Sequence, residues 1–157
     1  MPSEERDEYH WRETYFILYD SRSRPTLTQI ERALGELSDR YQLGRLMADD
    51  EGRFESLTLN SPDDNAALEI SHEEGEAVVE QTTELAKQLK NEAEPDQLAA
   101  LLKADARLDV MHFEQVTPGE EDEEEMLDPS CLLLVVDALV KLTEGIPIDP
   151  ASGAILP

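Results

Sequence analysis

The sequence predicts one α+β domain, built as a two-layer sandwich with the β-α-β-β-α-β element order of ferredoxin-like folds and a buried helix appended at its C-terminal end. Three observations lead to this fold class. An aromatic and β-branched run, WRETYFILY, is typical of a strand near the centre of a sheet. Segments with helical apolar spacing follow segments with alternating spacing. A chain of 157 residues is long enough for one core and short for two.

The first elements are a tail, a strand and a helix. Residues 1–10 are mostly charged and have no apolar period, so we expect a flexible acidic tail before a single domain over 11–157. The strand covers 11–19 and the loop DSRSRP follows it. Thr26 and Gln29 form a T-x-x-Q capping box. The next apolar residues recur at spacings of three and four, which predicts a helix of about three turns.

The remaining elements follow from turn residues and apolar periods. A polar turn, ADDEG, between 41–47 and 54–59 predicts a hairpin. Leu68 and Ile70 indicate a further short strand, and a helix begins after Gly75. A second short helix begins at Pro95, a strand covers 107–116, and a helix runs from Pro129 to about Thr143 before a short strand at 146–149.

Ten side chains are predicted to form the core, since they sit on the apolar stripes and faces of these elements. They are Phe16, Ile17, Leu18, Ile30, Leu34, Leu59, Val110, Leu132, Val136 and Leu139. The segment 117–128, in contrast, contains seven acidic residues and no basic one, so we expect an acidic loop there.

The charge of the chain is strongly negative: 37 acidic and 13 basic residues give a net charge of −24. Such a field repels nucleic acid and anionic lipid, so we expect no nucleic-acid partner and no membrane partner. The field attracts basic proteins and cations. It also suits a salt-rich habitat, in which surface charge keeps a protein hydrated. Habitat and partner binding therefore both stay open as explanations of the charge.

The single cysteine, Cys131, excludes an internal disulfide and lies in an apolar run, which indicates a buried thiol. The start of the chain, MPSEERDEYHW, lacks the pattern of a signal peptide. The longest apolar run, 131–136, is far shorter than the roughly 20 residues that a membrane span needs. We therefore expect a cytoplasmic protein.

No catalytic motif occurs in the chain. The glycine patterns of nucleotide-binding loops and of the nucleophile elbow are absent, and no serine has a histidine in a recognisable arrangement. The segment HEEGE, which begins at His72, lacks the second histidine of a zinc-binding helix. We accordingly expect no catalytic residue, no cofactor and no metal site.

Two groups of residues are candidates for binding a small ligand. Arg22 and Arg24 precede the helix cap at Thr26, where free backbone N–H groups and the helix dipole favour an anion. Both arginines alternatively only neutralise nearby acids such as Asp20. His112 and Glu114 are two apart on a strand and so point to one face, where they could hold an ion or form a base with its orienting carboxylate. Alternatively, they form a polar pair facing solvent.

Two functions remain after these exclusions. The first is a non-enzymatic interaction or regulatory module with an acidic surface, whose partner is a basic protein or a second copy bound through the sheet. A sheet face left open would imply such a dimer, because its apolar residues would otherwise meet water. The alternative is a small-ligand sensor or a small enzyme that uses an anion pocket in the loop 20–26.

Overall fold

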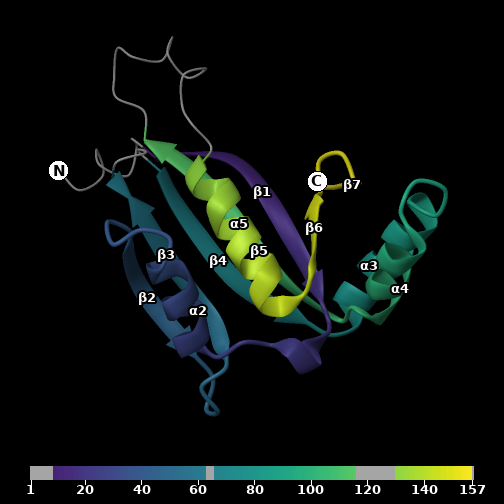
Figure 1. Ribbon diagram of the computed structural model, residues 1–157, viewed down its shortest axis with the longest axis horizontal. Coiled ribbons are helices and arrows are strands. Elements are labelled where there is room, and N and C mark those ends of the chain that lie inside the picture. The colour runs from purple at the N-terminus through teal and green to yellow at the C-terminus, as the bar shows by residue number, and fades with distance from the viewer. Residues whose placement is uncertain (1–8, 63–65, 116–129, 157) are drawn as a thin grey trace, which may run out of the picture.

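The computed structural model describes residues 9–62, 66–115 and 130–156, and their strands form one seven-stranded sheet in the order β2-β3-β4-β5-β1-β6-β7 (Figure 1). Every pair of neighbouring strands in it is antiparallel. The strands are β1 (Tyr9–Tyr19), β2 (Gln42–Ala48), β3 (Phe54–Ser61), β4 (Ala66–Glu74), β5 (Ala106–Gln115), β6 (Ile146–Asp149) and β7 (Ala154–Ile155).

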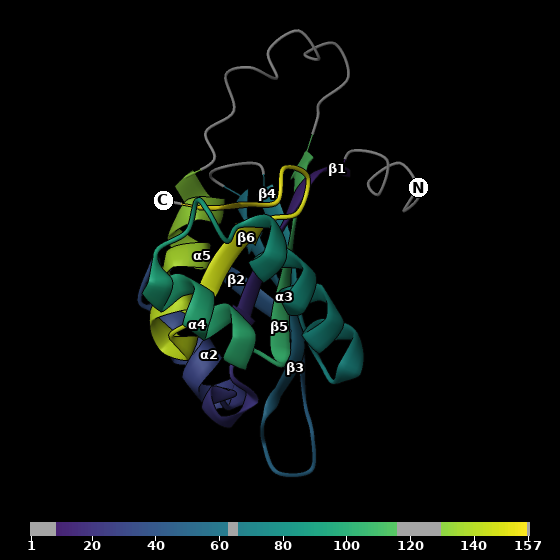
Figure 2. The same cartoon turned by 90° about the vertical axis from the view of Figure 1, so that its right-hand side faces the viewer.

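Helices cover the two faces of the sheet unequally. The helices α2 (Leu27–Gly35) and α5 (Ser130–Thr143) lie across one face, which we call the covered face (Figure 1). The helices α3 (Glu76–Gln88) and α4 (Pro95–Lys103) pack against the opposite face, where α4 contacts β1 and β6 and α3 contacts β4 and β5 (Figure 2). The molecule therefore has three layers at one end and two at the other.

The ferredoxin-like two-layer prediction is wrong. The segment around Leu68 and Ile70 is a strand of nine residues, β4, which extends the β2–β3 hairpin into a three-stranded meander. The helical pair α3 and α4 then returns the chain, so that β5 lies antiparallel beside β4, and β1 lies between β5 and β6. Apolar periods reveal the elements, but strand pairing depends on which faces are covered, and that information is not local.

Most of the individual elements are confirmed. Strands occupy the predicted positions near 11–19, 41–59, 107–116 and 146–149, and helices follow Gly75 and begin at Pro95. The helix α2 starts with the predicted capping box, in which Gln29 N donates to Thr26 Oγ1 at 3.1 Å and Thr26 N donates to Gln29 Oε1 at 2.9 Å. The loop 117–128 and residues 1–8 of the tail lie outside the described residues, while Tyr9 and His10 belong to β1.

The main core lies between the covered face and the helices α2 and α5. Nine of the ten predicted core side chains are buried, and Phe16 is half-buried. The helix α5 is less enclosed than its composition predicts: Cys131 and Leu139 face the sheet, whereas Leu133 and Leu134 are 50% and 46% exposed. A smaller core joins α3 and α4 to β1 and β6 on the other face. None of the helices in the described ranges is long and apolar enough to cross a membrane.

Candidate functional site

Arg22 lies in the loop after β1, where its guanidinium binds the carboxylate two residues earlier. Nη2 of Arg22 is 2.6 Å from Oδ2 of Asp20, and Nε is 3.1 Å from the same carboxylate. The hydrogen bonds from Arg22 lower the pKa of Asp20 to about 2. Arg22 is exposed and neutralises Asp20, which is the alternative to an anion pocket given above.

Arg24 is held inside the protein rather than presented to a ligand. Its side chain is 9% exposed, and Nε and Nη2 donate to the carbonyl oxygen of Phe54 at 3.2 and 2.8 Å. Its Nη1 lies 3.6 Å from Glu74 Oε1 and 3.8 Å from Asp49 Oδ2. Thr26 uses its hydroxyl in the helix cap. The three residues of the predicted anion pocket thus direct their polar groups at separate partners within the protein.

His112 and Glu114 point to one face of β5, as predicted, but that face is the covered one. Their residues are 2% and 6% exposed, so a solvent-facing pair is the wrong interpretation. A bulge in β1 between Trp11 and Glu13 turns two charged side chains towards them. Nδ1 of His112 lies 2.6 Å from Oε2 of Glu13, and Nε of Arg12 lies 2.8 Å from Oε1 of Glu114.

These contacts neutralise the buried polar pair from within the chain. A buried charge is costly unless an opposite charge accompanies it, which explains why Arg12 lies beside Glu114. The Oε1 atom of Glu114 accepts no hydrogen bond of good geometry, although the ion pair with Arg12 is short. Within the described ranges, no group of three or more histidine, cysteine or carboxylate side chains is arranged to hold a metal ion.

A second polar chain, which sequence reasoning missed, lies at the other end of the covered face. The Tyr19 hydroxyl lies 2.7 Å from Nδ1 of His72, and Nε2 of His72 lies 2.8 Å from Oε1 of Glu74. The short side chain of Ala106 stands between Tyr19 and Glu74 in the strand register, which leaves room for the rings to meet. Because Tyr19 and His72 are 53 residues apart, no local pattern could have revealed the pair.

Burial determines the protonation states of Tyr19 and His72 and limits their contact with solvent. Desolvation raises the pKa of Tyr19 and lowers the pKa of His72, so both are neutral at pH 7. The Tyr19 hydroxyl then donates to Nδ1, and Nε2–H donates to Glu74. Tyr19 is only 2% exposed, so its oxygen cannot approach a substrate. The arrangement resembles a proton relay in its order of groups but acts as a tie between β1 and β4.

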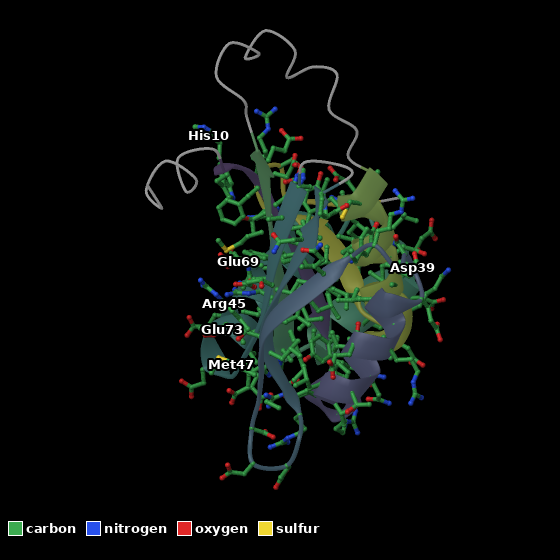
Figure 3. The ribbon with its side chains drawn as sticks, turned by 90° about the vertical axis from the view of Figure 1, so that its left-hand side faces the viewer. His10, Asp39, Arg45, Met47, Glu69 and Glu73 are labelled. Carbon is green, nitrogen blue, oxygen red and sulfur yellow. The ribbon has the colours of Figure 1, made fainter. Side chains whose placement is uncertain are left out.

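On the other face of the sheet α3 contacts β4 and β5, whereas α3 and α4 do not pack against β2 and β3. We call the uncovered part of this face, which spans β2 to β5, the open face (Figure 3). It holds the alternate residues of the same strands, and the helical pair α3 and α4 lies beside it (Figure 2). Two adjoining hollows of about 480 and 270 Å³ share Arg45, Thr58 and Glu69. The open face comprises Arg45, Met47, Ser56, Thr58, Asn60, Ala67, Glu69, Ser71, Met111 and Phe113.

The side chains of the open face are partly apolar and unusually accessible. Met47 is 55% exposed, and Met111 and Phe113 are half-buried beside the hollows. Arg45 and Glu69 are exposed, and neither forms an ion pair or side-chain hydrogen bond with another described residue. Arg45 has φ 51°, in a bulge of β2 between Gly44 and Met47. A non-glycine residue at positive φ is strained, and such strain gathers at functional sites.

A third hollow, of about 580 Å³, lies between α3 and the turn after β6. Its lining includes Glu80 and Glu84 from α3 and Pro150 from the turn. We call it the acidic groove. It carries negative charge without a basic residue in its lining, so it differs in charge from the open face.

Comparisons with known proteins give no relative of this chain: no family model, no curated protein and no solved structure matches it. A proposal about its function therefore rests on the residues of the chain itself.

Proposed function

We propose that this chain is a non-enzymatic interaction module that binds a protein partner on the open face of its sheet. The observation that carries the proposal is a sheet surface that spans β2 to β5 and holds two hollows, which no described helix residue lines and to which Met47, Met111 and Phe113 contribute. Exposed apolar patches framed by polar residues are typical of protein-binding sites in soluble chains.

The strand pattern supports this proposal. On the covered face, Leu59, Leu68 and Val110 are fully buried by the helices. On the open face the alternate positions hold neither the uniform apolar residues of a buried face nor the uniform charge of a solvated one. Methionine, threonine and phenylalanine beside single charges form a surface of intermediate polarity, as protein interfaces do.

The alternative function, a small-ligand sensor or small enzyme at the loop 20–26, has less support. Arg22 binds Asp20 and Arg24 binds the Phe54 carbonyl, so an anion would have to displace contacts that the protein already makes. The buried polar groups at both ends of the covered face also have protein partners. This favours binding over catalysis.

The partner is a basic protein or a second copy of the chain, acting in the cytoplasm. The net charge of −24 draws basic proteins in general, and the acidic groove with Glu80 and Glu84 is a place where such a protein could be held. The open face offers apolar contact instead. The two surfaces therefore predict opposite responses to salt, since screening weakens a charge-docked complex and leaves an apolar one intact.

A charged side chain at the centre of the open face tests the proposal. We expect Thr58→Arg to abolish binding of the partner, whether another protein or a second copy, because the new guanidinium would be desolvated against it. The matched control is Thr83→Arg on the exposed surface of α3, which changes the net charge equally. Binding is measured by affinity capture from native lysate and by sedimentation of the purified chain, with circular dichroism to verify folding. Binding that survives Thr58→Arg unchanged would contradict the proposal.

A further inference from the structure

The open face is nearly neutral, which is unexpected in this chain. The chain as a whole has 24 more acidic than basic residues, whereas the centre of the open face holds one of each, Arg45 and Glu69. Glu73 lies farther along β4, on the same side as both (Figure 3). A surface evolved to dock a basic protein would concentrate acids. A surface that meets a copy of itself must avoid them, since each charge is presented twice.

Arg45 and Glu69 lie on the strands to either side of Thr58, on β2 and β4. Gly44, next to Arg45, pairs with Thr58 across β2 and β3, and Thr58 pairs with Glu69 across β3 and β4. Neighbouring strands are about 4.8 Å apart, so the two charges stand about one strand spacing to either side of β3. Both side chains project from the open face, away from α2 and α5 (Figure 3).

The placement of opposite charges on either side of β3 favours one way of stacking two sheets. Building on the proposed binding role of the open face, we infer that its occupant is a second copy of this chain, related by a two-fold axis that runs along β3 above Thr58. That rotation exchanges the two sides of β3, so Arg45 of each copy faces Glu69 of the other. A two-fold axis across the strands would instead set Arg45 against Arg45, which like-charge repulsion disfavours.

The packing distance and the sheet edges are consistent with this dimer. Sheets that stack face to face lie about 10 Å apart, a gap that arginine and glutamate side chains can bridge. Pairing through the edges is disfavoured in comparison. The edge strand β2 is interrupted by register shifts between Gly44 and Ala48, and β7 at the other edge has two residues. The face is therefore the larger continuous surface that one copy can offer another.

Charge reversal tests the inference directly. In the dimer, Arg45→Glu places a carboxylate against Glu69 at both symmetry-related contacts, and Glu69→Arg places a guanidinium against Arg45 at both. We expect each single variant to dimerise at least about a hundredfold more weakly than the native chain, because opposed like charges cost several kcal/mol. A mixture of the two variants should form a heterodimer in which both contacts join opposite charges, one with the native signs and one with the signs exchanged. The double variant should form a homodimer in which both contacts are restored with exchanged signs. The measurement is sedimentation velocity over a wide range of concentration.

Matched controls separate the contact from net charge. Arg32→Glu in α2 and Glu36→Arg at its C-terminal cap change the charge by the same amounts at exposed positions off the open face. Neither should weaken the dimer by more than a few-fold. Salt provides a second control: two copies of charge −24 repel, so the native dimer should tighten between about 0.1 M and about 1 M salt, as the Debye length falls from about 10 to about 3 Å. Circular dichroism establishes whether each variant folds. If a charge-reversal variant does not fold, the neutral variants Arg45→Gln and Glu69→Gln are measured instead.

The outcomes distinguish this inference from the function on which it rests. A chain that stays monomeric at high salt and high concentration would overturn the second copy. So would a dimer that Arg45→Glu and Glu69→Arg leave intact, or reversals that weaken it without rescue in the double variant. If a different protein binds and Thr58→Arg abolishes that binding, the open face is still the docking site and only its occupant is wrong. If Thr58→Arg affects no association of any kind, both proposals fail.

Discussion

The two faces of strands β3, β4 and β5 are built from alternate residues of the same chain segments, yet they differ in burial and in the pairing of their polar groups. On the covered face, Leu57, Leu68 and Leu108 are at most 2% exposed beneath α2 and α5. On the open face, the neighbouring residues Thr58 and Glu69 remain accessible beside two hollows. The helices α2 and α5 therefore bury one face of these strands, whereas the positions around the two hollows on the other face stay exposed.

The covered face is also where polar groups are paired most completely. His72 is held between Tyr19 and Glu74 at one end, and His112 meets Glu13 at the other. Buried polar groups that lost such partners would cost about 1–3 kcal/mol each. On the open face Arg45 and Glu69 have no partner among the described residues, and both are exposed to solvent.

The sharpest contrast between the faces is the cost of truncating an apolar side chain. Leu59→Ala on the covered face should lower the free energy of unfolding by roughly 2–5 kcal/mol, because Leu59 is 0% exposed and its loss leaves a cavity. Met47→Ala on the open face should change it by about 0.5 kcal/mol or less, since Met47 is 55% exposed. Urea denaturation of the monomer measures both. Equal losses would mean that the open face is packed as a core.

Close packing at the end of α5 gives the next largest effect. A Cβ on Gly145 would lie 2.7 Å from Cγ2 of Ile17 and 2.9 Å from the carbonyl oxygen of Leu18, a backbone atom that cannot move freely. We expect Gly145→Ala to destabilise the protein by about 1–3 kcal/mol. Gly35→Ala is the control: a Cβ there meets nothing within 4 Å, and alanine should be neutral or stabilise α2 by up to about 1 kcal/mol. Thermal unfolding that ranks the two variants in the opposite order would contradict this packing.

The covered face should also respond to pH through His72. Burial depresses its pKa below the usual 6.5, so the unfolded chain takes up a proton at a pH where the folded chain does not. The stability that neutral His72 contributes is present above pH 6.5 and is lost as the pH falls through 6.5 towards the folded pKa, by at most about 1.4 kcal/mol per pH unit. The free energy difference between the native chain and His72→Gln should therefore shrink below about pH 6.5. A difference that is independent of pH would refute the assignment.

Salt should have the smallest effect on the folded monomer. If the charge of −24 reflects a salt-rich habitat, screening of repulsion among the carboxylates should raise the stability slightly. The measurement is made on Thr58→Arg, which we expect to be monomeric, so that dimerisation adds nothing to the apparent stability. A loss of stability with salt would mean that attractive ion pairs, such as that of Arg12 with Glu114, outweigh the repulsion.

The sequence predicts the local elements well, since their signals are local. The capping box at Thr26, the proline at position 95 and the alternation around Val110 each mark an element within a few residues. The sequence does not predict the arrangement of the sheet, because Leu68 and Ile70 indicate only a short strand where β4 has nine residues, and because strand pairing joins distant segments. β7, with two residues, gives no periodic signal at all.

The candidate site was predictable only in part. The spacing of His112 and Glu114 correctly placed both on one face, but which face is covered depends on where α2 and α5 pack. The sequence does not predict whether a face of the sheet is open; it indicates only that an open face would favour a dimer. Its central residues, Arg45 and Glu69, lie in ordinary polar strands, and a bulge such as the one at Arg45 has no reliable signature in a single sequence.

The methyl resonances of the open-face methionines report directly on whether a second copy binds that surface. Nuclear magnetic resonance spectra of the methyl-labelled chain are recorded over a concentration series in about 1 M salt, where charge repulsion is screened. The resonances of Met47 and Met111 should shift together as the dimer forms, while those of Leu133 and Leu134 on the exposed side of α5 should stay in place. Shifts confined to the α5 leucines, or no shift at any concentration, would contradict dimerisation through the open face.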